Sequence, residues 1–310
     1  MHISIIIPAY ASANHIQTTH KTTVTSLEKL GKDFEIIYVN DHSPDNVWRE
    51  IQKICETDVR AVGISLAKNY GQHAAIFVGL QNAKGQYTVT IDDDLQNPPS
   101  EIAKLISKLD EGYDLAVGFF QEKKHAPYRK VGSKFIHLLV AKIFGSNTDF
   151  KNTNFRAFTL DVKNRILQYN GHFPYITGLA ILNAARPINV EVKHAKRVDG
   201  ASTYSLWRLL KLATRIMFCY SDMLIRWLAV IGILTSVVSL AVGMYALVHG
   251  LVNEGTMPGW ASIIVFVAFS NSVIFLILTA MASFLSQVNS MIALPSPFVV
   301  SARTSYGDKS

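Results

Sequence analysis

The stretch that decides the fold is Thr88–Gln96, which reads TVTIDDDLQ. A strand pattern ends here in three consecutive carboxylates, and Asp92 and Asp94 point the same way because strand side chains alternate. Carboxylates this close repel one another unless a cation lies among them, and Mg²⁺ or Mn²⁺ suits hard oxygen ligands that share the ion with substrate phosphates. The alternative is an acidic turn that caps a helix beginning near residues 98–100.

Short apolar runs alternate with helical patterns through the first half of the chain. The strand candidates are Ile3–Ile7, Glu35–Val39, Val59–Ser65, Tyr87–Ile91 and Leu115–Gly118. The helical patterns lie near His15–Leu30, Asn46–Thr57, His73–Ala83 and Ser100–Glu111. This alternation predicts an α/β fold with a mostly parallel sheet and helices on both faces. Ligands of such sheets bind at the carboxyl ends of the strands, so the candidate site residues are those that follow each strand.

A second carboxylate, Asp41, follows the second strand candidate and is placed to accept hydrogen bonds from a ribose or a base. Ordinary turn chemistry explains the Asp-x-Ser-Pro run equally well. No Gly-x-Gly-x-x-Gly follows the first strand and no Walker lysine motif occurs, which argues against a dinucleotide-dependent oxidoreductase and a P-loop enzyme. A nucleotide bound here would therefore be held by a metal and carboxylates.

The C-terminal third is apolar and follows a basic segment. The formal net charge of +7 favours anionic partners, and the basic residues of segment 204–226 favour a membrane surface over nucleic acid. Trp227–His249 and Trp260–Leu285 each exceed the roughly 20 apolar residues that cross a bilayer. We therefore expect a two-helix transmembrane hairpin, with a buried soluble hairpin as the alternative.

The charges around this hairpin predict its orientation. The connection between the two spans has no Lys or Arg, whereas Arg226 and Arg303 flank the hairpin, so the positive-inside rule places both ends in the cytoplasm. The N-terminus lacks the features of a signal peptide. Segments 204–226 and 133–144 have the pattern of interfacial amphipathic helices, although 133–144 fits an ordinary core-packing helix equally well.

Four segments carry a resemblance to a known family. In chain order they are residues 5–10 (IIIPAY), 40–45 (NDHSPD), 66–73 (LAKNYGQH) and 92–99 (DDDLQNPP). Together they resemble the family-2 inverting glycosyltransferases of the GT-A (Rossmann-like) fold. The most similar subgroup acts on polyprenyl phosphates and includes dolichol-phosphate mannose synthase, bactoprenol glucosyltransferase and the undecaprenyl-phosphate aminoarabinose transferase. Residues 197–204 (RVDGASTY) are similar to the Arg-x-x-Gly-x-Ser-x-Tyr run of that subgroup.

The resemblance implies a role for each matching residue. The catalytic residues would be Asp92 and Asp94, and a Mg²⁺ or Mn²⁺ ion would be held by Asp92, Asp94 and Gln96. The residues expected to bind the nucleotide sugar are Pro8, Tyr10, Asp41, Lys68, Gly71 and Asp92. The residues expected to bind the acceptor phosphate are Arg129, Ser133, Arg197, Ser202 and Tyr204. For the two arginines, contact with anionic lipid headgroups is the alternative.

This sequence departs from the family pattern at three places. Residues 11–13 (ASA) replace an Asn-Glu-Glu run, Asn40 replaces the first of two aspartates, and Asn154 stands where many members carry an aspartate that is often proposed as catalytic base. A base is dispensable here, because a phosphate monoester has a second pKa of about 6 and already offers a nucleophilic oxygen at neutral pH. The departures therefore point to an unusual donor sugar.

The resulting hypothesis is an inverting glycosyltransferase that moves a sugar from a nucleoside diphosphate, with UDP favoured over GDP, to undecaprenyl phosphate at the cytoplasmic face of the inner membrane. Its expected parts are a cytoplasmic GT-A domain (1–203), an amphipathic juxtamembrane helix (204–226), two transmembrane helices (227–285) and a cytoplasmic tail (286–310). Relatives suggest a homo-oligomer. The alternative is a catalytically inactive relative that acts as a scaffold in lipid-linked sugar assembly.

Overall fold

The computed structural model describes residues 2–120, 141–145, 150–171, 173–193, 206–220 and 298–307, with scattered residues between 230 and 288. The chain divides into two compact units, one formed by Met1–Ala213 with Ser296–Ser310 and the other by Thr214–Pro295. The first unit contains the sheet and all the described candidate site residues. Helix α8 (Leu206–Tyr220) begins in the first unit and ends in the second.

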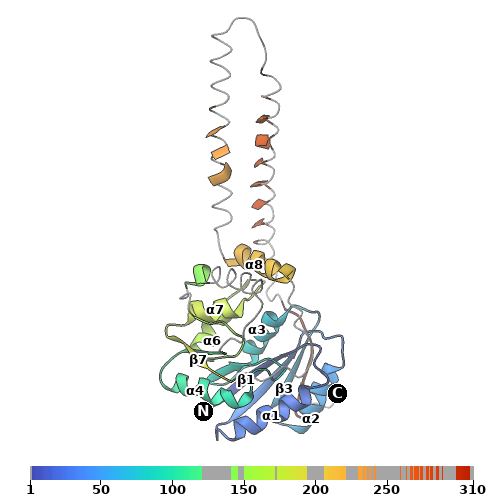
Figure 1. Cartoon of the computed structure of the whole chain (residues 1–310). Coiled ribbons are helices and arrows are strands. Elements are labelled where there is room, and N and C mark those ends of the chain that lie inside the picture. The colour runs from blue at the N-terminus through green and yellow to red at the C-terminus, as the bar shows by residue number, and fades with distance from the viewer. Residues whose placement is uncertain are drawn as a thin grey trace, which may run out of the picture. The chain divides into compact units, whose positions relative to one another are not determined.

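One mixed sheet organises the first unit, and its order among the described residues is β7-β5-β6-β4-β1-β2-β3-β8 (Figure 1). The strands are β1 Ile3–Ala9, β2 Phe34–Asn40, β3 Ala61–Leu66, β4 Tyr87–Thr90, β5 Leu115–Phe119, β6 Arg156–Thr159, β7 Pro187–Glu191 and β8 Val300–Ser305. Strands β1 to β4 pair in parallel, whereas β6 runs antiparallel to β4 and β5, and β8 runs antiparallel to β3. The five predicted strands are β1 to β5, and the predicted parallel pairing is confirmed at the centre of the sheet.

Helices alternate with the strands as the sequence predicts. They are α1 Ile16–Glu28, α2 Val47–Thr57, α3 Gln72–Asn82, η1 Pro99–Glu101, α4 Ile102–Asp110, α6 Leu160–Leu167 and α7 Ile176–Asn183. The first four α-helices coincide with the four helical patterns. Helix α2 shows why, because its apolar residues Val47, Ile51, Ile54 and Cys55 recur at helical spacing and are buried, while most of the remaining positions carry polar or charged groups.

Strand β1 lies at the centre of two cores. All seven of its residues are buried, as a central parallel strand requires. Its side chains alternate, so Ile5 and Ile7 join a core with α1, α2 and α4. Ile6 faces α3, where a Cβ atom on Gly79 would lie 2.5 Å from the Ile6 Cγ2 atom. The glycine therefore lets α3 approach the strand more closely than any other residue would.

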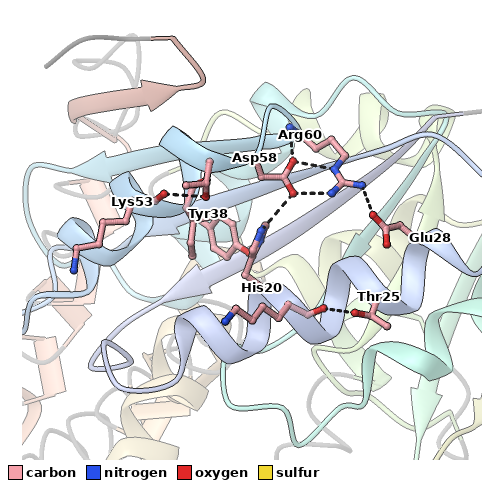
Figure 2. Close-up of polar contacts among 10 residues, drawn as sticks. His20, Thr25, Glu28, Tyr38, Lys53, Asp58 and Arg60 are labelled. Carbon is pink, nitrogen blue, oxygen red and sulfur yellow. Dashed lines mark hydrogen bonds and ion pairs between the residues drawn. The ribbon is translucent and has the colours of Figure 1, made fainter.

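A polar network ties α1 to β2 and to the turn before β3, as Figure 2 shows. The Asp58 carboxylate accepts hydrogen bonds from Arg60 Nη2 at 2.8 Å and Nε at 2.9 Å, and its Oδ2 lies 3.4 Å from His20 Nε2. Tyr38 Oη lies 2.9 Å from the other ring nitrogen of His20, and Arg60 also donates to Glu28. Burial lowers the pKa of His20, and the Asp58 charge opposes that shift. The network has a structural role.

The C-terminal segment supplies an edge strand of the first unit. Strand β8 pairs with β3, with Thr304 opposite Gly63. Just before it, Phe298 is buried, and its ring packs edge-on against Tyr70 and against Phe77. Residues expected only as a tail therefore complete the sheet beside a candidate binding loop.

The predicted transmembrane hairpin is wrong. Within the ranges that the structure describes, no helix combines the length and the apolar character needed to span a bilayer. The prediction of two membrane-spanning helices at 227–285 is corrected accordingly, as is the inner-membrane localisation with both ends in the cytoplasm. Apolar composition shows that a segment can be buried but leaves open what buries it. Most of 227–285 and most of 133–144 lie outside the described residues, while α8 falls within segment 204–226.

Replacing Gly79 with alanine tests the close packing of α3 on β1. Alanine favours a helix by about 1 kcal/mol over glycine, but here its methyl group collides with Ile6. We expect the overpacking to dominate and to lower the free energy of unfolding by about 1–3 kcal/mol, measured by urea denaturation. The control is Thr22→Ala on the exposed surface of α1, which should leave stability nearly unchanged. A Gly79→Ala protein as stable as the wild type would contradict the packing described here.

Candidate functional site

Strands β1, β2 and β4 deliver the residues that follow them to one edge of the sheet (Figure 1). Their parallel register places Ala9 opposite Asn40, and the Asp41 N–H donates to the Ala9 carbonyl at 3.1 Å. The Tyr10 N–H donates to Asp93 Oδ2 at 3.2 Å, which joins the ends of β1 and β4. The structure therefore brings Tyr10, Asp41 and the acidic run to the same edge of the sheet.

Asp41 holds a loop in place. Its side chain is buried, and its two carboxylate oxygens accept hydrogen bonds from the backbone N–H groups of Tyr70 and Gly71, each at 2.8 Å. Burial raises the pKa of Asp41, and these two hydrogen bonds oppose the rise. Gly71 has a φ of +94°, a conformation that favours glycine, and it immediately precedes α3. Asp41 thus fixes the loop that leads into α3.

The other residues predicted to bind the nucleotide differ in exposure. Pro8 is buried within β1 opposite Val39, so it shapes the strand end. Tyr10 has a relative accessibility of 51 %, and Lys68 is also exposed, with its Nζ atom 5.1 Å from the centre of the Tyr70 ring. The side chains of Tyr10 and Lys68 are therefore accessible to a ligand.

The three consecutive aspartates have different partners. Asp92 accepts hydrogen bonds from Gln72 Nε2 at 2.5 Å and from Asn97 Nδ2 at 3.2 Å. Asp93 accepts the Tyr10 N–H described above, and Asp94 Oδ1 accepts the Gln96 N–H at 3.1 Å. The run therefore forms a structured turn as well as a cluster of charge. It does not cap the following helix, since neither η1 nor α4 has a side-chain hydrogen bond at its N-cap.

Burial and mutual repulsion act on the first two aspartates. The pKa of Asp92 rises to about 6, first because the group is buried and then because Asp94 and Asp93 carry like charges nearby. Burial also raises the pKa of Asp93, against the hydrogen bond from the Tyr10 N–H. Ionised Asp92 is thus disfavoured in the folded protein on its own, and a cation beside it would remove that cost.

The oxygen ligands at this site fit a hard divalent cation that is coordinated by both the protein and a substrate. In the part of the chain that the structure describes, no group of three or more His, Cys, Asp or Glu side chains is arranged to hold a metal ion unaided. The predicted ligands Asp92, Asp94 and Gln96 offer only oxygen donors. Mg²⁺ and Mn²⁺ typically take one or two carboxylates and complete their coordination with phosphate oxygens and water.

Left-handed backbone conformations gather around this edge. Among the described residues, the non-glycine residues with positive φ are Ala11 at 54°, His42 at 50° and Leu95 at 57°. They follow β1, β2 and β4 respectively, the three strands whose ends form the site. Such conformations cost about 1–2 kcal/mol for residues with a Cβ atom, and strain of this kind is concentrated at functional sites.

Four further residues belong to the network around Asp92, and of these only Asn154, at the position of the family's proposed base, was singled out from the sequence. Gln72 and Asn97 lie inside the segments quoted above, but their side chains had no assigned role. Arg156 is the first residue of β6, a strand absent from the sequence prediction, and Asn154 lies two residues before it. Arg156 is 1 % exposed, and burial lowers its pKa to about 10 while Tyr175 and Asp92 oppose the shift. The sequence signal that could have identified Arg156 is its position within a short, mostly apolar run, residues 154–158 (NFRAF).

An aromatic group adjoins Gln72 on α3. The His73 ring packs edge-on against Tyr175 at 4.8 Å and against Phe173 at 6.1 Å between ring centres. Burial lowers the pKa of His73 to about 3, and the charge of Arg156 lowers it further. His73 is therefore neutral at physiological pH and acts as a packing residue.

The predicted acceptor-phosphate residues lie outside the described residues. These are Arg129, Ser133, Arg197, Ser202 and Tyr204. Their role remains a prediction.

The fold and the site together define a GT-A-like α/β domain that places carboxylates at the ends of parallel strands. A family profile described as "Glycosyl transferase family 2" matches residues 4–168, which is more than half of the 310 residues. The chain therefore belongs to glycosyltransferase family 2. The match covers the strands and helices from β1 to α6 and includes every residue described around Asp92.

Solved structures are similar to this chain at low sequence identity. Glucosyl-3-phosphoglycerate synthase from M. tuberculosis is 18 % identical with a TM-score of 0.50, covering 70 % of this chain and 78 % of that one. The same enzyme with Mn²⁺, UDP-glucose and phosphoglyceric acid is 18 % identical with a TM-score of 0.49, over 70 % and 77 % of the two chains. Residues 1–349 of S. aureus TarS are 18 % identical with a TM-score of 0.43, and the match spans 63 % of this chain and 59 % of that one.

The raised pKa of Asp92 predicts a pH-dependent gain in stability for Asp92→Asn. Because the folded pKa is about 6 against an ordinary 3.8, ionisation costs stability as pH rises from about 4, and the full cost is present above pH 6. We expect the variant to match the wild type at pH 4 and to exceed its unfolding free energy by about 1–3 kcal/mol at pH 7.5 in urea denaturation.

The control for this prediction is Asp110→Asn, for which the effect has the opposite sign. A hydrogen bond from Lys32 lowers the pKa of Asp110, so its ionised form contributes stability at pH 7.5 that the variant lacks. A gain in the free energy of unfolding at pH 7.5 in both variants would show a general effect of removing negative charge. If Asp92→Asn shows no gain, the raised pKa of Asp92 is contradicted.

Proposed function

We propose that this chain transfers a sugar, with inversion, from a nucleoside diphosphate to a polyprenyl phosphate, with UDP and undecaprenyl phosphate as the favoured pair. The observation that carries the proposal is the half-buried Asp92 carboxylate just after β4, held by Gln72 and Asn97 beside Asp93 and Asp94. A cation with a bound diphosphate would stabilise this carboxylate in its ionised form. The acceptor class is supported by the sequence of residues 197–204, and the donor class by residues 92–99.

Each part of the site has a task in this proposal. Tyr10 and Lys68 reach the nucleotide from the solvent side, and Asp41 keeps the loop at Tyr70 and Gly71 in position for it. Asp92, Asp94 and Gln96 would hold Mg²⁺ or Mn²⁺. When bound, such an ion neutralises the negative charge that develops on the leaving diphosphate.

The transfer itself breaks one bond and forms one. An oxygen of the acceptor phosphate attacks the anomeric carbon from the face opposite the diphosphate, and the nucleoside diphosphate leaves with the bonding electron pair. No side chain needs to remove a proton, because the phosphate second pKa of about 6 leaves the attacking oxygen unprotonated. Alignment of the reactants is the main requirement. Asn154 is consistent with a transfer that needs no general base, because its amide group is not basic. Its two polar atoms form hydrogen bonds with Gln72 and Arg156.

The direct test is turnover by the purified full chain, with detergent to disperse the lipid. Labelled nucleotide sugars are mixed with Mn²⁺ and undecaprenyl phosphate, and lipid-linked sugar is measured. We expect product with at least one UDP-sugar, and we expect Asp94→Ala to abolish it, because that variant removes a carboxylate from the cation site. The matched control is Asp33→Ala, an aspartate on the loop before β2 and away from the candidate site, which should retain full activity.

Two results would contradict the proposal. Full activity in Asp94→Ala would remove Asp94 from the reaction. Absence of lipid-linked product with every donor, from a protein that still binds UDP with Mn²⁺, would favour a scaffold or a different acceptor.

A further inference from the structure

Two side chains and three hydrogen bonds connect a buried arginine to the acidic run. Arg156 Nη2 donates to Asn154 Oδ1 at 2.9 Å, and Asn154 Nδ2 donates to Gln72 Oε1 at 3.1 Å. Gln72 Nε2 then donates to Asp92 Oδ1 at 2.5 Å. The chain of hydrogen bonds crosses from β6 to the first residue of α3 and ends just after β4, so three elements meet in it.

The direction of these hydrogen bonds is fixed by chemistry at both ends. A guanidinium group only donates, so Asn154 must present its oxygen to Arg156 and its nitrogen to Gln72. An ionised carboxylate only accepts, so Gln72 must present its nitrogen to Asp92 and its oxygen to Asn154. Both requirements give the same orientation for each amide, and a flip of either amide would break two hydrogen bonds.

The end of this hydrogen-bond chain at Arg156 and Asn154 is held rigidly. Arg156 pairs with Thr90 in the antiparallel register of β6 and β4, and Thr90 Oγ1 donates to the Asn154 carbonyl at 2.5 Å. Thr90 lies two residues before Asp92, so the two ends of the hydrogen-bond chain share one pair of strands. The Arg156 side chain is buried and its Nε atom has no hydrogen-bond partner among the described residues, which leaves the Nη2 contact as the directed one.

We propose that Gln72, Asn154 and Arg156 are positioning residues that fix the direction of the Asp92 carboxylate toward the cation that would bind the diphosphate of the donor. Asn97 holds the second oxygen of Asp92. With one donor on each oxygen the carboxylate cannot rotate, and its remaining lone pairs have fixed directions. This inference rests on the proposed function, because the fixed lone pairs would serve the cation that binds the donor diphosphate.

The hydrogen-bond chain orients a group and transfers no proton. Both amides use a nitrogen as donor and a carbonyl oxygen as acceptor, and neither is basic at physiological pH. Asn154 therefore acts at a distance from the reacting atoms, through Gln72. A carboxylate at position 154 would accept from Arg156 but would have no hydrogen to donate to Gln72.

Asn154→Asp is the decisive variant, since it keeps the shape of the side chain and removes its donor. Gln72 must then turn its nitrogen toward the new carboxylate, and its oxygen faces Asp92. We expect the affinity for UDP with Mn²⁺, measured by calorimetry, to fall about tenfold, as loss of a hydrogen bond to a charged group predicts. The thermal midpoint should not fall, because the new carboxylate would pair with Arg156.

Two further variants separate positioning from general damage. Gln72→Leu removes the donor to Asp92 and should weaken binding by a similar factor, and adding Asn154→Asp to it should change affinity no further. Asn183→Asp makes the same chemical change at the end of α7, where the Asn183 amide donates to the Leu179 carbonyl of its own helix, and it should bind like the wild type. Independent, multiplying losses in the double variant would overturn the inference.

A crystal structure of Asn154→Asp tests the hydrogen-bond chain without reference to function. The inference requires the Gln72 amide to leave Asp92 or to invert there, and an unchanged Gln72–Asp92 hydrogen bond overturns it. Wild-type protein that fails to bind UDP with Mn²⁺ would defeat the proposed function, and with it the purpose assigned to these residues, whatever the crystal structure shows. Wild-type binding with equal affinity in Asn154→Asp would defeat the positioning role alone.

Discussion

The parallel pairing of β1 with β2 on one edge and β4 on the other is the constraint on which the structure depends. A strand buried on both faces and paired on both edges has no access to water along its length, so every residue of Ile3–Ala9 is apolar or small. Buried polar side chains occur within these strands, as in the Ser4–Glu35 hydrogen bond, whereas accessible polar groups return where the three strands end. The same pairing makes those ends coincide, so the first polar residues after each strand meet at one edge. Binding chemistry at this edge therefore follows from the requirements of the core.

The acidic run shows how such an edge accommodates charge. Asp93 is bonded to the backbone after β1, Asp94 to its own turn, and Asp92 to two amide side chains, so three adjacent carboxylates serve three different contacts. Left-handed residues after each of the three strands make these turns possible. The site thus combines backbone strain with a raised pKa at Asp92. Both are costs to the free protein that a bound ligand with positive charge would offset, which is the usual relation between stability and function at such sites.

The sequence predicted the first five strands and four helices because each segment carries its own periodicity. It missed β6, β7 and β8, and the first and last of these pair with distant residues: Arg156 lies opposite Thr90, and Thr304 lies opposite Gly63. The acidic run and Asp41 were predictable as strand-end carboxylates. The role of Asn154 and Arg156 was not, because a buried arginine contradicts the pattern that places charges outside. The prediction of a transmembrane hairpin was wrong because hydropathy measures the tendency of a segment to be buried. It does not identify what surrounds the buried segment.

Strand β8 belongs to the first unit but is made after the second. A ribosome adding about 5–20 residues per second needs roughly 4–16 s to pass through Thr214–Pro295. During that interval the edge of β3 has no partner strand, and Phe77 lacks the ring of Phe298. An open edge of this kind can pair with other chains, so the newly made protein is most prone to association in this interval. Tyr70, whose backbone N–H bonds to Asp41, is the last part of the binding edge to gain its packing partner. This edge of the sheet therefore gains its full packing only after Phe298 and β8 have been made.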